Sequence, residues 1–356
     1  MKTFQIAVLP GDGIGVEVTD EALKVLRVVE ARMTGVRFEI AEYAVGAGAY
    51  RSGQNPFPES TLAACREADA VLLGAMGLPE VRWPDGKEIA PQLDLREQLD
   101  LYCGVRPIRL YHEADTPLKH YRAGEIDLVI VRESTEGLFS TRLAKRQDGA
   151  RKVLDELKVT RSGSERLFRA AFRIAGQRRK RLSLIDKANV LPSMVFFREV
   201  FDAIARDYPQ VETERLYVDC AALFLVQRPQ VFDVLVTENM FGDILSDLAA
   251  GLVGGMGMAP SADIGDDCAV FQPAHGSAPD IAGRGIANPV AMILSVAMML
   301  DWLGHTETTV AAERLRVAVE RVLANPIHRT ADLGGKLSTG EMGKLIASEL
   351  ERTWHA

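Results

Sequence analysis

Two aspartates stand four residues apart in a segment of otherwise apolar or small residues. The segment reads TENMFGDILSDLAAGLVGGMGMAP (residues 237–260), and the aspartates are Asp243 and Asp247. At helical spacing they share one face, with roughly 6 Å of rise between them. Like charges repel at that spacing, and the apolar neighbours predict that both are at least partly buried. A bound cation would offset the repulsion. A helix cap at Asp243, with Asp247 an ordinary helix residue, is the alternative.

The ligand types at this position define the metal. Together with Asp219, the two aspartates offer only hard oxygen ligands, with no histidine or cysteine beside them. This favours Mg²⁺ or Mn²⁺ over zinc. Lys187 is a candidate acid/base, because burial beside other cations lowers the pKa of a lysine into the working range. A plain salt bridge is the alternative for Lys187.

Three arginines suggest what the metal would act on. They lie in LDLREQLDLYCGVRP and VRES and are Arg96, Arg106 and Arg132. Guanidinium groups hold carboxylates through two parallel hydrogen bonds. Three of them near a divalent cation predict a small di- or tricarboxylate substrate, whereas each alone would be an ordinary surface arginine.

A second loop has the composition of a cofactor site. LPGDGIGVEV has glycines at 11, 13 and 15 but lacks the GxGxxG spacing of a dinucleotide fingerprint. HGSAPDIAGRGIANP (275–289) is the better candidate, since its backbone amides could hold a diphosphate and Asp280 could bind a ribose diol. A carboxylate there would repel a 2′-phosphate, which favours NAD over NADP.

Strands and helices alternate along the chain, which is the signature of an α/β fold. Strands are expected in residues 4–10, 36–45 and 68–77, and helical periodicity follows from residue 16 and in 164–178. The later strand candidates DLVIVRES, RLSLIDKANV, ERLYVD and FDVLVTEN each end at or just before a charged side chain. Since ligands bind beyond the carboxyl ends of strands in such sheets, these ends predict one site.

Composition limits the class of protein. With 356 residues, two domains are expected. A mean hydropathy of +0.01 suits an ordinary globular protein, and a net charge of −7 argues against a nucleic-acid partner. Four widely spaced cysteines suit a reducing compartment. The start of the chain has no signal-like stretch, and residues 290–304 are too short to span a membrane, so a cytoplasmic protein with a buried helix there is expected.

The ordered set of these motifs resembles the isocitrate/isopropylmalate dehydrogenase family of metal-dependent β-decarboxylating dehydrogenases. The resemblance covers nearly the whole chain, from LPGDGIG through LDLREQLDLYCGVRP, VRESTEG, DKANVL and NMFGDILSD to HGSAPDIAGRGIANP. It implies an isopropylmalate dehydrogenase-like fold of two α/β domains, with the active site in the cleft between them. The larger, discontinuous domain would be 1–101 plus 256–356, and 102–255 would form the smaller one.

The resemblance also implies roles and a homodimer with shared active sites. Lys187 and Asp219 would be catalytic, and Asp219 would complete the metal site with Asp243 and Asp247 of the other subunit. The arginines would bind a 2-hydroxy dicarboxylate. The matching cofactor residues, which would bind NAD, are His275, Gly276, Ser277, Ala278, Asp280, Ile281 and Asn288.

One position departs from the family's pattern. The family protonates the enolate formed after decarboxylation with a tyrosine in RE-x-T-x-G-x-Y, where this chain has Phe139 in RESTEGLF. Another donor, Ser140 or a water, would have to substitute. A regulatory, non-catalytic subunit is an alternative that only Phe139 supports.

The C3 substituent of the substrate is read a turn before the first arginine in this family. Here Gln92 and Leu93 occupy that region beside Ile89, which gives a mixed polar and apolar pocket. The expected substrate is therefore a 3-alkylmalate such as 3-isopropylmalate, with D-malate or tartrate as the alternative.

Overall fold

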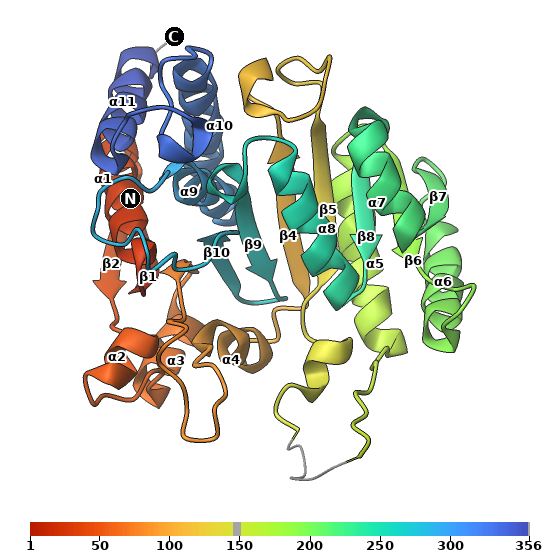
Figure 1. Ribbon diagram of the computed structural model, residues 1–356. Coiled ribbons are helices and arrows are strands. Elements are labelled where there is room, and N and C mark those ends of the chain that lie inside the picture. Colours follow the sequence, from red (N-terminus) through yellow and green to blue (C-terminus); the bar gives the residue numbers. More distant parts are fainter. Residues whose placement is uncertain (145–150, 355–356) are drawn as a thin grey trace.

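The computed structural model describes residues 1–144 and 151–354. Ten strands form a single mixed sheet in the order β2-β1-β3-β10-β9-β4-β5-β8-β6-β7, with helices packed against it (Figure 1). The α/β class predicted from the alternation is confirmed. The strands are β1 Lys2–Gly11, β2 Val36–Glu42, β3 Ala70–Ala75, β4 Cys103–Arg109, β5 Asp127–Glu133, β6 Arg181–Asp186, β7 Glu212–Tyr217, β8 Val234–Thr237, β9 Pro260–Ile264 and β10 Ala269–Pro273.

Most of the helices follow apolar stripes at helical spacing, as in α5, whose buried face includes Leu167, Phe168, Ala171 and Phe172. The predicted helix at 290–304 is α9, with nearly every residue buried. The helices are α1 Ile14–Arg32, α2 Ala47–Arg51, α3 Glu59–Glu67, α4 Pro91–Gln98, α5 Arg161–Gly176, α6 Pro192–Ala205, α7 Val218–Gln227, α8 Asn239–Gly251, α9 Val290–Trp302, α10 Thr306–Leu323 and α11 Thr339–Thr353.

Side chains alternate between the two faces of the sheet, and each face has its own helical cover. On β5, Val129 and Val131 belong to the core beneath α5 and α6, whereas Leu128 and Ile130 belong to the core shared with α7 and α8. Period-two alternation is what places successive side chains on opposite faces. The middle of the sheet is therefore buried on both sides.

The two ends of the chain share one core. Phe4 and Ile6 of β1 pack with Leu294 of α9, Leu315 of α10 and Ile346 of α11. The cores beneath α5 to α8 are built almost entirely from residues between 102 and 259. We propose that these cores are the two predicted domains, 1–101 with 256–356 and 102–255. The sheet runs through both, since β9 pairs with β4.

The directions of the strands bring the predicted strand ends to one edge of the sheet. β5, β8, β6 and β7 are mutually parallel, so their carboxyl ends lie at one edge. β9 runs in the same direction as β5, because both are antiparallel to the strand between them, β4. Within the described ranges, no helix is long and apolar enough to cross a membrane.

Candidate active site

The arginine cluster begins with a row of three residues across neighbouring strands. Gly104 of β4 lies opposite Arg132 of β5 on one side and opposite Asp263 of β9 on the other. Directly opposed residues of antiparallel strands project to the same face. A Cβ on Gly104 would lie 2.8 Å from Ser134 Oγ and 3.1 Å from Asp263 Oδ1, so the glycine leaves the space in which these side chains approach each other.

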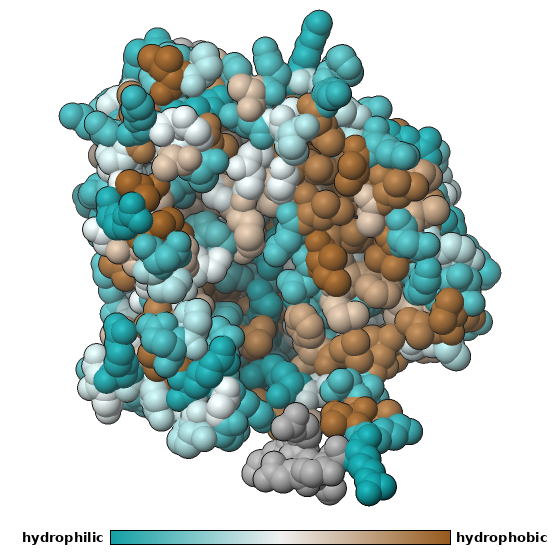
Figure 2. Space-filling view, in the orientation of Figure 1, coloured by the Kyte–Doolittle hydropathy of each residue, from teal (hydrophilic) through white to brown (hydrophobic). Residues whose placement is uncertain are grey.

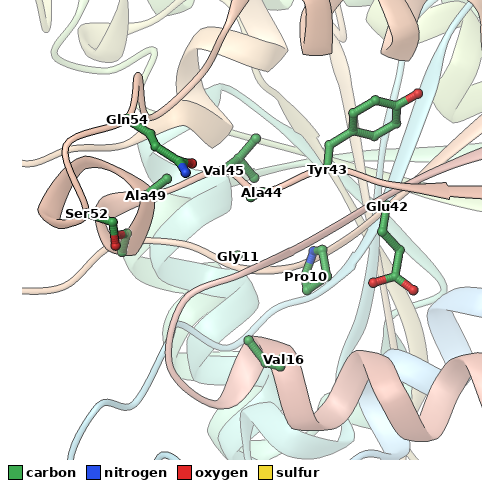
Figure 3. A pocket seen from close by; sticks show the side chains of 11 residues that line it. Pro10, Gly11, Val16, Glu42, Tyr43, Ala44, Val45, Ala49, Ser52 and Gln54 are labelled. Carbon is green, nitrogen blue, oxygen red and sulfur yellow. The ribbon is translucent and has the colours of Figure 1, made fainter.

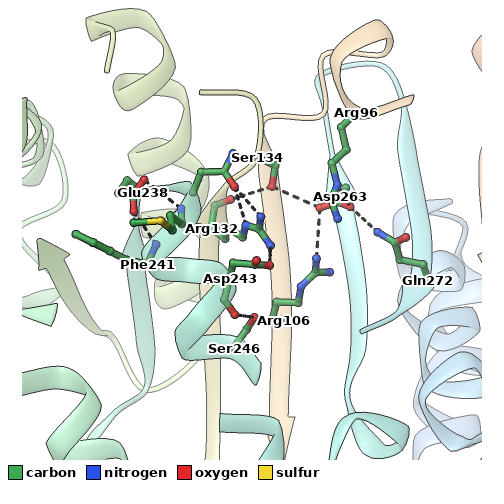
Figure 4. A network of polar contacts seen from close by, with 12 residues as sticks. Arg96, Arg106, Arg132, Ser134, Glu238, Phe241, Asp243, Ser246, Asp263 and Gln272 are labelled. Atoms are coloured by element: carbon green, nitrogen blue, oxygen red, sulfur yellow. Dashed lines mark hydrogen bonds and ion pairs between the residues drawn. The ribbon is translucent and has the colours of Figure 1, made fainter. Parts of the chain in front are cut away.

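Arg132 is held rigidly at the centre of this cluster (Figure 4). Its side chain is 2% exposed and forms an ion pair with Asp243. Nε and Nη2 donate to Asn239 Oδ1 at 3.0 and 2.7 Å, and Asn239 Nδ2 in turn donates to the Glu136 carbonyl. Close packing of α8 adds to this, because a Cβ on Gly242 would lie 2.7 Å from Arg132 Cβ.

Arg96 and Arg106 join the same cluster through Asp263. Arg96 Nε donates to Asp263 Oδ2 at 2.8 Å, and Arg106 Nη2 lies 3.9 Å from Oδ1. Gln272 Nε2 donates to Oδ2 at 2.5 Å. The three arginines that the sequence predicted to act together therefore meet at one place.

Burial makes this cluster a strong anion site. The pKa of Arg132 is lowered to about 10, first by burial and then by the charge of Arg96. The pKa of Arg106 is also lowered by burial, and its Nη1 is buried without a hydrogen-bond partner. Buried guanidinium groups with unused donors gain most from an added anion.

Asp243 and Asp247 lie on α8 at helical spacing, as predicted. Asp243 has a side chain 46% exposed and Asp247 is the more exposed of the two, so the partial burial predicted for both is slight at Asp247. The reason is that α8 presents this face to the outside of the chain. The pKa of Asp247 is raised by partial desolvation and by the charge of Asp243.

Lys187 and Asp219 form a separate pair. Lys187 Nζ donates to Asp219 Oδ1 at 2.6 Å, so the salt bridge anticipated for this lysine exists. This contact lowers the pKa of Asp219. Asp219 lies at the second position of α7, not at a strand end. In the described part of the chain, no three acidic, histidine or cysteine residues cluster at metal-binding distance. Asp219 is thus not joined to Asp243 and Asp247 within one chain.

Phe139 lies at the arginine cluster, in a 3₁₀ turn over Leu138–Thr141. Its ring centroid is 5.4 Å from the Arg132 guanidinium. Ser140, the alternative proton donor, has its hydroxyl committed to the Gly137 carbonyl at 2.8 Å.

Gln92 and Leu93 lie on α4, the helix that carries Arg96. Leu93 is half-buried, and nearby Ile89 is completely buried. Gln92 Oε1 is buried without a hydrogen-bond partner. This wall therefore combines apolar surface with one unused polar atom.

The candidate cofactor loop is anchored to the first loop of the chain. Ser277 Oγ donates to the Gly77 carbonyl, and the Ser277 carbonyl accepts from Ile14 N at 2.8 Å. A Cβ on Gly13 would lie 2.0 Å from that carbonyl oxygen, so only glycine allows the approach. The glycine loop at residues 11–15, which lacks the dinucleotide spacing, thus packs directly against the candidate cofactor loop at 275–289.

The remaining loop residues differ in what they offer a ligand. Asp280 is exposed, and Ile281 packs partly on the core. His275 is half-buried, and desolvation of its ring lowers its pKa; Nε2 is buried without a partner among the described residues. Asn288 uses its side chain inside the chain, since Nδ2 donates to Asp332 and Oδ1 accepts from Val290 N. The backbone positions at Gly276 and Ala278 are half-buried or exposed, and Ala278 has a positive φ of 38°.

A pocket of about 590 Å³ lies between the first loop and the segment over residues 42–54 (Figure 3). It is bounded by Pro10, Val16, Tyr43 and Gln54, among others. None of its described lining residues is a predicted site residue.

The predictions from the sequence did not include several residues that hold the site together. Asp263 and Asn239 bind the arginines, and Gln272 binds Asp263. Asp12, 4% exposed, accepts hydrogen bonds from the backbone N–H groups of Ala47 and Gly48 at the start of α2 and of Gly77 after β3. A charged residue inside the short apolar strand PSADI was the only signal for Asp263.

Comparison with known proteins agrees with this arrangement. The family model described as isocitrate/isopropylmalate dehydrogenase matches residues 5–346. The chain belongs to the isocitrate/isopropylmalate dehydrogenase family. The resemblance inferred from the motifs is thereby confirmed, and with it the class of β-decarboxylating dehydrogenases, which are oxidoreductases acting on CH–OH groups.

Within this family, several relatives share the full length of the chain. A 3-isopropylmalate dehydrogenase from Moorella thermoacetica is 46% identical, covering 98% of this chain and 99% of its own. One from Thermotoga maritima is 46% identical over 99% of this chain and 100% of its own.

Solved structures of the isocitrate/isopropylmalate dehydrogenase family have the same fold. Isocitrate dehydrogenase from Methylococcus capsulatus has a TM-score of 0.86 at 37% identity, covering 98% of this chain and 99% of its own. A β-decarboxylating dehydrogenase from Thermococcus kodakarensis, in its apo form, has a TM-score of 0.79 at 37% identity, covering 98% and 96%. The predicted fold class is confirmed.

Proposed function

We propose that this chain catalyses the NAD- and divalent-metal-dependent oxidative decarboxylation of a 3-substituted D-malate, with 3-isopropylmalate as the substrate. The products would be 2-oxo-4-methylpentanoate, CO₂ and NADH. The observation that carries the proposal is the buried arginine cluster directly beside Asp243. The relatives named 3-isopropylmalate dehydrogenase, 42–46% identical over the full chain, support the choice of substrate.

The residues present fit a hard divalent cation. Asp243 and Asp247 offer carboxylates on one helix face. The pKa of Asp247 is raised by partial desolvation and then by the charge of Asp243, and a bound cation would offset both. We propose that they hold Mg²⁺ or Mn²⁺ together with Asp219 of the partner subunit. When bound, the cation supplies stabilisation of negative charge on the substrate's C2 oxygen.

The loop at 275–289 fits NAD. Asp280 is exposed and pairs with no arginine in the described ranges, so its carboxylate can accept hydrogen bonds from a ribose diol. We propose that its neighbours His275, Gly276, Ala278 and Ile281 line the site. Ser277 and Asn288, whose side chains bond within the chain, would act by shaping it. When bound, NAD supplies the hydride acceptor.

Side chains of this chain would bind the substrate and transfer its protons. Arg96, Arg106 and Arg132 orient the substrate through the carboxylate that departs as CO₂. Lys187, hydrogen-bonded to Asp219 at 2.6 Å, accepts the proton of the C2 hydroxyl. Phe139 has no proton to donate, so protonation of the enolate at C3 falls to another group or to water.

These roles require two subunits, because the lysine pair and the metal carboxylates are not joined within one chain. The surface over α7 and α8 has the matching character, with a broad apolar patch in Figure 2. Leu223, Val226 and Ile244 are 49%, 45% and 60% exposed on these helices. Exposed apolar patches of this kind mark protein interfaces. We propose a homodimer that buries this patch and brings Lys187 of the partner subunit to the arginine cluster.

One observation favours a second substrate. Gln92 Oε1 is buried without a partner beside the position of the C3 substituent, and an unpaired buried acceptor costs about 1–3 kcal/mol. A hydroxyl at C3 would satisfy it, whereas an isopropyl group would not. Tartrate, with D-malate as its smaller analogue, is therefore the alternative substrate.

We also propose a cytoplasmic location, since all four cysteines are free thiols.

The test is an assay of NADH and CO₂ formation with Mg²⁺ or Mn²⁺. Four compounds distinguish the candidate substrates: 3-isopropylmalate, D-malate, tartrate and isocitrate. We expect the highest kcat/KM for 3-isopropylmalate. A higher value for tartrate would replace the substrate, and the Gln92→Leu variant should then reverse the order. NADH formation without CO₂ from every substrate would overturn the proposed reaction.

A further inference from the structure

The arginine cluster contains a carboxylate of its own that has no access to solvent. The Asp263 side chain is 1% exposed, and it meets Arg96 at 2.8 Å and Arg106 at 3.9 Å. Gln272 and, more weakly, Ser134 at 3.5 Å complete its contacts. In Figure 4 it lies between these side chains, with Arg96 on one side and Arg106 on the other.

Asp263 differs in kind from the other carboxylate of the cluster. Asp243 is 46% exposed and faces the proposed metal, so a ligand can draw it away from Arg132. Asp263 projects from a central strand into the space left by Gly104, and Gln272 holds it from the next strand. It therefore stays with the arginines whether or not a ligand is bound.

The charge of Asp263 is permanent for a physical reason. Burial alone would raise its pKa, but the charges of Arg96, Arg106 and Arg132 outweigh burial and lower it. Three guanidinium groups thus share one fixed negative charge, and Asp243 adds a second only while it stays paired with Arg132. When a ligand or the proposed metal draws Asp243 away, two positive charges remain among these side chains, which offsets the total charge of a dianion and not that of a trianion.

We propose that Asp263 is a specificity-determining residue, a built-in carboxylate that restricts the arginine cluster to dianionic substrates. This rests on the proposed function only in that the arginines bind the substrate. Arg96 and Arg106 each direct one nitrogen toward Asp263. The buried, unpartnered Nη1 of Arg106 remains for the ligand. A third carboxylate on the ligand would have to compete with Asp263 for the same donors.

Binding of two inert anions to the metal-free protein tests this without turnover. Succinate is a dianion and tricarballylate a trianion, and neither has the C2 hydroxyl that oxidation needs. Calorimetry gives the Kd of each for the wild type and for Asp263→Asn. We expect wild type to prefer succinate, and the variant to shift the Kd ratio toward tricarballylate by about tenfold, since one buried unit charge is removed from beside the ligand.

The matched control is Asp266→Asn, in the loop between β9 and β10. This change removes the same charge three residues away, where the carboxylate accepts from the Tyr102 hydroxyl at 3.1 Å and from no other group of the described residues. We expect its Kd ratio to equal that of the wild type. Asp263→Ser, smaller and also neutral, serves if the asparagine variant folds poorly.

Two results would overturn the proposal. One is a Kd ratio unchanged in both Asp263 variants, which would give Asp263 a structural role alone. The other is an equal shift in Asp266→Asn, which would reduce the effect to net charge. Because no product is measured, failure of the proposed reaction would show in the substrate assay and leave this comparison intact.

Discussion

Asp243 and Asp247 carry the same charge on the same helix, yet their removal should change the stability of the metal-free protein in opposite directions. Asp243 is the ion-pair partner of Arg132, a side chain only 2% exposed. Asp247 has no such partner among the described contacts, and its pKa is raised by desolvation and by Asp243. Asp243→Asn and Asp247→Asn therefore form a matched pair.

Asp243→Asn leaves the charge of Arg132 buried with only the hydrogen bonds to Asn239. Breaking a fully buried ion pair costs about 3–5 kcal/mol. Because half of the Asp243 side chain is exposed, solvent screening reduces the expected loss to about 1–2 kcal/mol. At roughly 2–4 °C per kcal/mol, the Tm should fall by about 2–8 °C.

Asp247→Asn should instead raise the stability slightly. Relief of a like-charge pair at this spacing contributes about 0.2–0.5 kcal/mol, which is at most about 2 °C in Tm. Since the folded pKa of Asp247 is raised, its ionised form destabilises the fold above that pKa. The gain should be present at neutral pH and vanish as the pH falls below the ordinary pKa of an aspartate.

Thermal unfolding followed by circular dichroism in excess chelator measures both changes, without and then with added Mg²⁺. In Mg²⁺ the wild type should be stabilised, and both variants should lose that increment. An Asp243→Asn protein as stable as the wild type in chelator would refute the assignment of Asp243 as the counter-ion of Arg132.

Three further predictions concern the reaction. Activity should disappear in excess chelator and return with Mg²⁺ or Mn²⁺. Full turnover in excess chelator would contradict the proposed metal dependence. Phe139→Tyr should raise turnover, by up to the about 10²–10⁴-fold that general acids contribute, if protonation limits the rate. An unchanged rate at unchanged Tm would show that another donor already acts. Replacing Asp280 and Ile281 by lysine and tyrosine should move the coenzyme preference toward NADP, and equal use of NADP by the wild type would contradict the role of Asp280.

The site residues that could be predicted from the sequence were those at the carboxyl ends of strands. Arg132 and Lys187 follow apolar runs that are buried on both faces, and parallel pairing brings such ends to one edge. Asp219 was misplaced because YVD reads as a strand end by periodicity, whereas α7 begins at Val218. The first turn of a helix and the last residue of a strand are not distinguished by pattern.

Asp263 and Asp12 could not be found from the sequence because their roles depend on long-range contacts. Asp263 binds Arg96, which is 167 residues away, and lies in a five-residue strand too short to show a period. Asp12 binds backbone groups 35 to 65 residues away. A buried carboxylate is expensive unless it is paired, so each marks a place where distant segments must meet.

The proposed function requires that Lys187 and Asp243 serve one active site from two different chains. Lys187→Met and Asp243→Asn are expected to be inactive alone, and mixing them through reversible unfolding forms dimers that carry one of each. If the residues come from opposite subunits, each mixed dimer has one intact site, and equal mixing should restore about one quarter of the wild-type NADH formation per chain. A mixture as inactive as its components, with mixed dimers verified by mass, would contradict the shared site.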